Sequence, residues 1–328
     1  MKRREFLIGS AFAAGSGARI WGQRSDSNKE KLDRIAIMTA CFSSIIKNPS
    51  RQNDPKRTFE LLDLPDMYAE HYGIHLLEPT CQHFTSTEPD YLKEFAGRLK
   101  KAKSGLNQIS LGQLSPVLPN SSATLLCISS PEPELRLEAV ELTRQWIDHA
   151  AFLGCTRVMV NQGTLMPEIR TETVATLKKM TDYGKSRNIK VTMETRGGGG
   201  GGAARGGRGR AGAGEGQAAD APARPTSYSG DWRVVVEVLK GAGAWTNVDI
   251  GNYPSEEDRH ASLRVMIPMS SGSCHAHYAP ERWNFHDTIQ LTKDLGYKGI
   301  WSVESGGNNG PDAYAQVQTI VDALVKEL

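Results

Sequence analysis

The feature that most constrains the fold is a regular alternation, from Arg34 onward, of short apolar runs with amphipathic segments. Such alternation is typical of a parallel α/β fold, in which each buried strand is followed by a helix that packs on the sheet. Eight apolar runs are the predicted strands: residues 35–40, 74–78, 108–111, 157–161, 190–194, 246–250, 270–275 and 299–304.

Apolar residues at helical spacing separate these runs, most clearly in segments 139–153, 285–295 and 317–324. Eight strand–helix units in about 275 residues predict a single-domain (β/α)8 TIM barrel. A doubly wound open sheet is the alternative. It is disfavoured because no predicted strand is followed by a GxGxxG or Walker loop, which nucleotide-binding sheets of that kind commonly carry.

Glycine is concentrated in one segment, residues 197–226, which holds 12 of the 33 glycines and several Arg-Gly steps. This segment has almost no large apolar side chain to bury, so we expect a disordered insertion after the fifth strand. Arg-Gly-Gly steps can bind RNA, but here no aromatic residues are interleaved with them. The predicted barrel therefore spans residues 34–328, interrupted by 197–226.

Residues 1–22 have the order of a secretory signal: a charged start, a short apolar run and then small residues. Arg3 and Arg4, followed by Phe6 and Leu7, resemble a twin-arginine signal. The apolar run is far shorter than the ~20 residues of a membrane span. We therefore expect export to the periplasm or beyond, with a retained N-terminal tether as an alternative and no stable membrane span.

Charge and cysteine usage exclude some classes of protein. Residues 1–22 carry +3 and residues 197–226 carry +2, so the rest of the chain has a net charge of −3 although the total is +2. An acidic body argues against nucleic-acid binding, which needs clustered Lys and Arg. Five cysteines without CxxC spacing indicate neither a zinc knuckle nor a disulfide framework.

Four residues of metal-binding types lie at the ends of the last four predicted strands: Glu194, Asp249, His275 and Glu304. Their separations are 55, 26 and 29 residues, and the first falls to about 25 when the ~30-residue insertion is removed. One such residue per strand–helix unit would bring all four to the C-terminal mouth of a barrel, where active sites of this fold lie. Three carboxylates and one imidazole suit a divalent metal such as Mn²⁺, with Mg²⁺, Co²⁺ or Zn²⁺ as alternatives.

With these residues in place, the chain resembles the sugar phosphate isomerase/epimerase superfamily, the xylose-isomerase-like TIM barrels. The resemblance implies a metal held by Glu194, Asp249, His275 and Glu304 on strands five to eight. His275-Ala276-His277 is similar to the family's His-x-Lys step, which places His277 where the family has a substrate-facing Lys. Because His275 and His277 point the same way from a strand, His277 could be the ligand instead.

Other positions bear on the substrate. Family epimerases often carry Asp-x-x-His on strand six, whereas this chain has Asn252 three residues after Asp249. We expect Asn252 and His277 to contact substrate, together with His83 after strand two and Asn161 at the end of strand four. The expected partner is a small sugar or glycoside, and an exported enzyme would more often meet unphosphorylated ones. The sequence does not indicate an oligomeric state.

The resemblance implies proton transfer at a carbon next to a carbonyl, through an enediolate, in a metal-dependent isomerase or epimerase. Glu194 and Glu304 are the predicted catalytic acid and base, one on each face of the sugar. The same groups acting on a 3-keto-glycoside would give a lyase by β-elimination. A third hypothesis is an exported barrel that binds sugar without catalysis.

Overall fold

The computed structural model describes residues 26–49, 54–111, 127–160, 162–163, 165–195, 231–305 and 312–328. The predicted signal 1–22, the Gly-rich insertion 197–226 and Asn161 therefore lie outside the described residues. The assigned strands are β1 (Ile35–Met38), β2 (Leu76–Glu78), β3 (Gly105–Leu106), β4 (Ile109–Ser110), β5 (Arg157–Val160), β6 (Lys190–Glu194), β7 (Trp245–Asp249), β8 (Ser270–Ala276) and β9 (Ile300–Val303). The assigned helices are α1 (Asp26–Leu32), α2 (Leu64–Tyr72), α3 (Pro89–Lys101), α4 (Pro133–Phe152), α5 (Arg170–Ser186), α6 (Trp232–Ala242), α7 (Glu256–Met266), α8 (Phe285–Asp294) and α9 (Asp312–Glu327).

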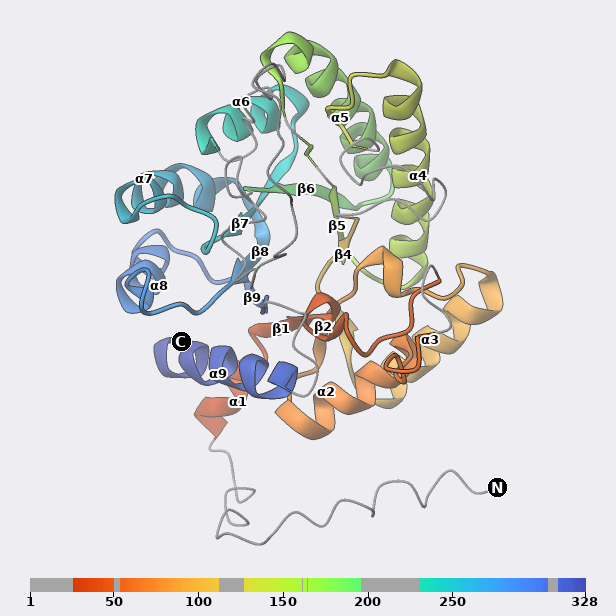
Figure 1. The fold of residues 1–328 in the computed structure, drawn as a ribbon, viewed down its shortest axis with the longest axis vertical. Helices are drawn as coiled ribbons and strands as arrows, with labels where there is room; N and C mark the ends of the chain where they lie inside the picture. Colours follow the sequence, from red (N-terminus) through yellow and green to blue (C-terminus); the bar gives the residue numbers. More distant parts are fainter. Residues whose placement is uncertain are drawn as a thin grey trace, which may run out of the picture.

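The strands form one parallel sheet with the order β3-β2-β1-β9-β8-β7-β6-β5-β4. A further parallel bridge joins Thr80, two residues beyond β2, to Ser110 of β4, so the chain after β2 pairs with the last strand of this order and closes the sheet. Seen along the barrel axis, the helices form a ring around the strands (Figure 1). The predicted (β/α)8 barrel is confirmed, and the doubly wound open sheet is wrong.

The third strand differs from the prediction. Residues 108–111 were expected to form one strand, but the third position in the barrel is divided between β3 and β4, which brings the assigned strands to nine. The break falls at Asn107 and Gln108, which both hydrogen-bond the carboxylate of Glu78. Neighbouring side chains of a regular strand point to opposite faces, so both can reach one acceptor only if the strand is interrupted.

Helix ends follow local sequence signals. The side-chain oxygens of Asp231, Ser255 and Asn284 accept hydrogen bonds from first-turn backbone N–H groups of α6, α7 and α8, respectively. After α8, Gly296 has φ of +80° and ends the predicted helix 285–295 where expected. The apolar stripes predicted in segments 139–153 and 317–324 lie on α4 and α9 and face the buried core.

An irregularity in β8 sets the register of the site. Thr246 of β7 pairs with Ser270, but Val248 pairs with Cys274, so β8 holds two extra residues over this interval. Gly272 supplies the positive φ, +93°, that such a distortion needs. As a result Asp249 lies directly opposite His275 in the sheet.

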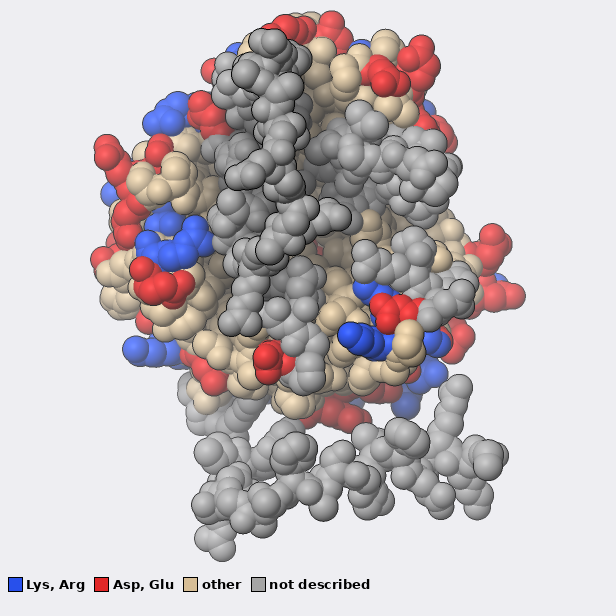
Figure 2. All heavy atoms as spheres, viewed as in Figure 1, with Lys and Arg blue, Asp and Glu red and all other residues tan. Residues whose placement is uncertain are grey.

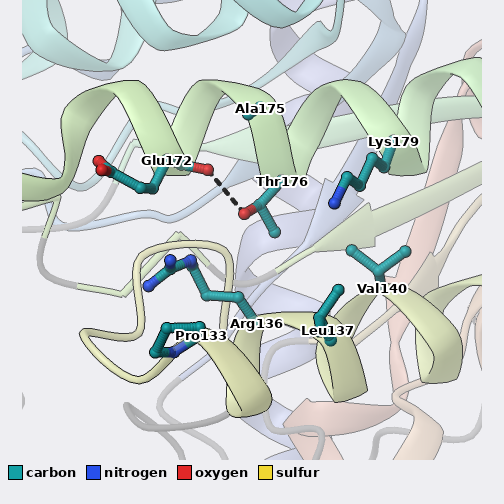
Figure 3. Close-up of a pocket in the computed structure, with 8 residues that line it drawn as sticks. All are labelled: Pro133, Arg136, Leu137, Val140, Glu172, Ala175, Thr176 and Lys179. Carbon is teal, nitrogen blue, oxygen red and sulfur yellow. Dashed lines mark hydrogen bonds between the residues drawn. The ribbon is translucent and has the colours of Figure 1, made fainter.

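The outer surface shows two features besides the barrel mouth. On the face in Figure 2, Lys and Arg side chains are interspersed with Asp and Glu rather than gathered in one patch. A groove of about 260 Å³ lies between α4 and α5 (Figure 3), with Leu137 and Val140 facing Ala175 and Thr176. It holds none of the predicted site residues.

Within the described residues, no helix has the length and apolar character needed to cross a bilayer.

Candidate functional site

The structure brings together the four side chains singled out at strand ends. Glu194 ends β6, Asp249 ends β7, His275 lies one residue before the end of β8, and Glu304 directly follows β9. One ligand-type atom from each lies within 4.8 Å of those from the other three. The parallel strands place their carboxyl ends at one rim, which is why residues 110 positions apart meet there.

His275 is the centre of this cluster. Its Nδ1 lies 3.1 Å from Oε2 of Glu194 and 3.0 Å from Oε2 of Glu304. The ring is fully buried, and Nδ1 makes no hydrogen bond of good geometry to the residues described. Its other nitrogen, Nε2, lies 2.8 Å from Oε1 of Glu78, a buried carboxylate at the end of β2.

The cluster is more open on the side of the two glutamates. The side chains of Glu194 and Glu304 are 14% and 10% exposed, whereas those of Asp249 and His275 are at most 1% exposed. A small molecule arriving at the barrel mouth would therefore meet the two glutamate carboxylates, while Asp249 and His275 are reached only by a bare ion or a proton.

The carboxylate of Asp249 is held by its neighbours. Its Oδ1 accepts a hydrogen bond from the backbone N–H of Gly251 at 2.8 Å. Its Oδ2 accepts from the amide of Asn252 and lies 3.2 Å from Nε2 of His277. The same amide nitrogen of Asn252 also donates to the carbonyl of Thr195 at 3.0 Å, so the structure ties Asn252 to Asp249. A substrate contact of Asn252 stays a prediction.

His277 lies beside the cluster. Its Nε2 is 3.2 Å from Asp249 and 3.5 Å from Oε2 of Glu304, and its side chain is 26% exposed. Burial alone would lower the pKa of His277, but the charges of Asp249 and Glu304 raise it to about 10. Of the two histidines, His275 belongs to the four-residue cluster. His277 borders it from the solvent side, where a substrate would arrive.

Buried charges interact strongly here. Burial favours neutral His275, yet the charge of Glu78 and the close contacts with Glu194 and Glu304 raise its pKa well above the ordinary value. Burial also works against ionised Glu304, but the charge of His277 and contacts with His275 hold its pKa well below the usual range. The carboxylates and the two histidines therefore stabilise each other's charged forms.

Gly251 allows His277 to pack close to the strand end. A Cβ at this position would lie 2.7 Å from Cδ2 and 2.9 Å from Cβ of His277, closer than side chains tolerate. We expect Gly251→Ala to cost about 1–3 kcal/mol of unfolding free energy through overpacking. Urea denaturation measures the loss. Repeating it in a His277→Ala background, where the ring is gone, should show a smaller cost, and an equal cost would contradict this packing.

His83 is buried in a cluster of hydroxyl groups. Its Nδ1 lies 2.7 Å from Oγ1 of Thr39 and 2.9 Å from Oγ1 of Thr80, and its Nε2 lies 3.4 Å from Oγ of Ser43. Burial first, and the charge of Arg57 second, lower the pKa of His83 to about 4. These local partners give His83 a structural role, and its predicted contact with substrate remains a prediction, as does that of Asn161.

The depressed pKa of His83 predicts acid sensitivity. The unfolded chain takes up a proton near pH 6.5, whereas the folded protein does so only near pH 4, so stability should fall as pH drops through this window. The contribution is up to about 3 kcal/mol. Chemical denaturation at several pH values should show a flatter profile for His83→Gln than for the wild type. An unchanged profile would contradict the assignment, and His286→Gln, an exposed histidine, is the matched control.

Glu78 is the residue that the sequence analysis did not single out. It ends a predicted strand with a carboxylate, as Glu194 and Glu304 do, so the same signal was present. Its role is not evident from the sequence because its contact with the cluster is made with His275, on a strand that is remote in sequence.

Comparison with solved structures supports this architecture. The chain is similar to a D-tagatose 3-epimerase-like protein, with 17% identity and a TM-score of 0.61 over 90% of this chain and 98% of that one. It is also similar to a D-allulose 3-epimerase from Methylomonas sp., with 13% identity and a TM-score of 0.62 over 90% and 98% of the two chains. A xylose isomerase-like TIM barrel protein from Mycobacterium smegmatis, in complex with magnesium, matches with 15% identity and a TM-score of 0.57 over 90% and 97%.

These likenesses establish the fold. No protein-family model matches the chain. No curated protein matches it either.

The donor set fits a divalent cation. It consists of three carboxylates and one imidazole, and the buried Nδ1 of His275 faces two of the carboxylates without hydrogen-bonding geometry. Oxygen-rich sites with one nitrogen suit Mn²⁺, Mg²⁺ or Co²⁺, and Zn²⁺ is also compatible. Glu194, Asp249, His275 and Glu304 are therefore the residues that could hold such an ion.

Proposed function

We propose that the protein is a divalent-metal-dependent sugar isomerase or epimerase that transfers a proton at a carbon next to a carbonyl, through an enediolate. The observation that carries this proposal is the cluster of Glu194, Asp249, His275 and Glu304 at the mouth of a (β/α)8 barrel. Sugar 3-epimerases among the structures of similar fold support the same class of reaction. Mn²⁺ is the proposed ion.

The side chains of the cluster would take different parts in metal binding and proton transfer. Asp249 and His275, both buried, hold the base of the site, and a divalent cation bound there would act as a Lewis acid toward the sugar oxygens. Glu194 and Glu304, on strands three apart, have slightly exposed side chains at the mouth. One would remove the proton from the sugar carbon and the other would return it, which epimerises the centre.

His277 is placed to bind rather than to catalyse in this scheme. It lies beside Asp249 and Glu304 with a quarter of its side chain exposed, so a ring N–H can donate a hydrogen bond to a sugar oxygen. We include it, with Asn252, His83 and Asn161, among the proposed substrate contacts. The substrate is proposed to be an unphosphorylated sugar or glycoside, in keeping with the export that residues 1–22 predict.

Solvent deuterium exchange tests the proposal directly. The protein is incubated in D₂O with Mn²⁺ and a panel of ketoses, and deuterium at the sugar carbons is followed by NMR. We expect metal-dependent incorporation next to the carbonyl and appearance of the epimer or isomer. Including 3-keto-glycosides tests the lyase hypothesis, because β-elimination releases the aglycone. Binding without any exchange would overturn the enzymatic proposal in favour of a sugar-binding barrel.

A further inference from the structure

Glu78 is an unusual residue for the inside of a barrel. It is fully buried, and its carboxylate accepts hydrogen bonds from the amides of Asn107 at 3.0 Å and Gln108 at 2.9 Å, besides its contact with His275. Barrel interiors are usually filled with branched apolar side chains. A buried ion rarely improves stability over a well-packed apolar residue, so the presence of Glu78 points to a role other than holding the fold together.

The contacts of Glu78 determine which nitrogen of His275 faces the cluster. Two amide N–H donors already point at the carboxylate, so Glu78 acts as an acceptor and Nε2 of His275 is the nitrogen that donates to it. A neutral imidazole carries one N–H and one lone pair. With the hydrogen on Nε2, the lone pair is on Nδ1, the atom between Glu194 and Glu304.

The two amide side chains that hold the Glu78 carboxylate are themselves hydrogen-bonded to β6 and β8, which also carry residues of the cluster. The hydroxyl of Thr192 donates to Oε1 of Gln108 at 2.7 Å, and the amide of Asn107 also donates to Oγ of Ser273 at 2.8 Å. Thr192 is two residues before Glu194 on β6, and Ser273 is two residues before His275 on β8. Residues two apart on a strand share a face, so this network lies directly beneath the cluster.

We propose that Glu78 is a positioning residue of the metal site: it fixes the tautomer and ring orientation of His275 so that the Nδ1 lone pair is presented to the ion. The break between β3 and β4 contributes to this positioning, because it allows the amides of both Asn107 and Gln108 to donate hydrogen bonds to the carboxylate of Glu78. The inference rests on the proposed function, which supplies the ion.

Metal affinity is the first test. The dissociation constant for Mn²⁺ is measured by chelator competition on the full chain, with folding checked by circular dichroism. Removing an outer partner of a metal-binding histidine typically weakens affinity by roughly 10- to 100-fold, and we expect this for Glu78→Gln. Glu78→Asp keeps the negative charge but moves the carboxylate away from His275, so it should weaken Mn²⁺ affinity as well. This variant replaces Glu78→Gln in the test if the Gln variant does not fold.

Thr143→Val is the control for loss of a buried polar group elsewhere in the fold. Thr143 is fully buried on α4, and its hydroxyl donates to the backbone carbonyl of Ala139 in the same helix at 2.7 Å. Because this partner lies on an outer helix rather than in the cluster, the substitution should leave the dissociation constant within about twofold, since changes at separate sites without shared partners do not couple.

A spectroscopic readout separates positioning from a merely structural role. In Zn²⁺-loaded protein with ¹⁵N-labelled histidine, we expect Nδ1 of His275 to carry the metal and its Nε2–H to give a downfield, slowly exchanging proton signal. Glu78→Gln should shift this signal upfield and speed its exchange. Coordination through Nε2, or an unchanged signal in the variant, would overturn the proposal.

The outcomes distinguish the two levels of inference. Equal Mn²⁺ affinities for the wild type and both Glu78 variants would overturn the positioning role while leaving the proposed function intact. If the wild type binds none of Mn²⁺, Mg²⁺, Co²⁺ or Zn²⁺, the metal site fails, and the role of Glu78 in it fails as well.

Discussion

Asp249→Ala and His275→Ala should each abolish stoichiometric binding of the metal ion. Both side chains are buried at the base of the cluster and each would supply one of its four ligands. We expect affinity to fall by at least roughly 100-fold, since even outer partners of a ligand are worth 10- to 100-fold. Elemental analysis of protein purified with Mn²⁺ should find one ion per wild-type chain and substoichiometric metal in the two variants.

His277→Ala is the control that tests which histidine is the ligand. His277 lies beside Asp249 and Glu304, but it is partly exposed and outside the four-residue cluster, so its removal should leave the ion bound. The opposite pattern, with metal retained in His275→Ala and lost in His277→Ala, would show that the ligand lies two residues further along β8.

The four strand-end residues could be singled out from sequence because their positions follow from a repeat. Each strand–helix unit returns the chain to the same rim, so a polar residue after each apolar run falls at the mouth whatever the details of packing. Glu194, Asp249 and Glu304 required only this periodicity. His275 was harder to separate from His277, since both lie on the same face of one strand and only the local distortion at Gly272 sets the register.

The interior network could not be derived in the same way. The contact between Glu78 and His275 joins strands that are remote in sequence, and it exists only once the sheet has closed. The division of the third strand follows from the same contacts, because Asn107 and Gln108 leave regular strand geometry to reach one carboxylate. Likewise, the environment of His83 depends on Thr39, which lies on the segment after β1. Local propensity carries no information about such pairings.

The largest effect on turnover is expected from Glu194→Gln and Glu304→Gln. Glutamine keeps the shape of the side chain but cannot accept the proton, and loss of a general base typically costs roughly 10²- to 10⁴-fold in rate. Both residues are also proposed ligands, so metal content has to be measured alongside and Mn²⁺ supplied at saturation. Glu257→Gln, an exposed glutamate in the first turn of α7, is the matched control and should leave the rate unchanged.

Deuterium incorporation then separates the roles of the two glutamates. With metal restored, the variant that lacks the abstracting glutamate should show no wash-in of deuterium, because the carbon–hydrogen bond is never broken. The variant that lacks the returning glutamate should still exchange this hydrogen, since the first base can return a solvent deuteron to the same face, yet it should fail to invert the centre. If both metal-loaded variants exchange and turn over at wild-type rates, the two-glutamate mechanism is wrong, and His277, which lies 3.5 Å from Glu304, becomes the group to test for proton transfer.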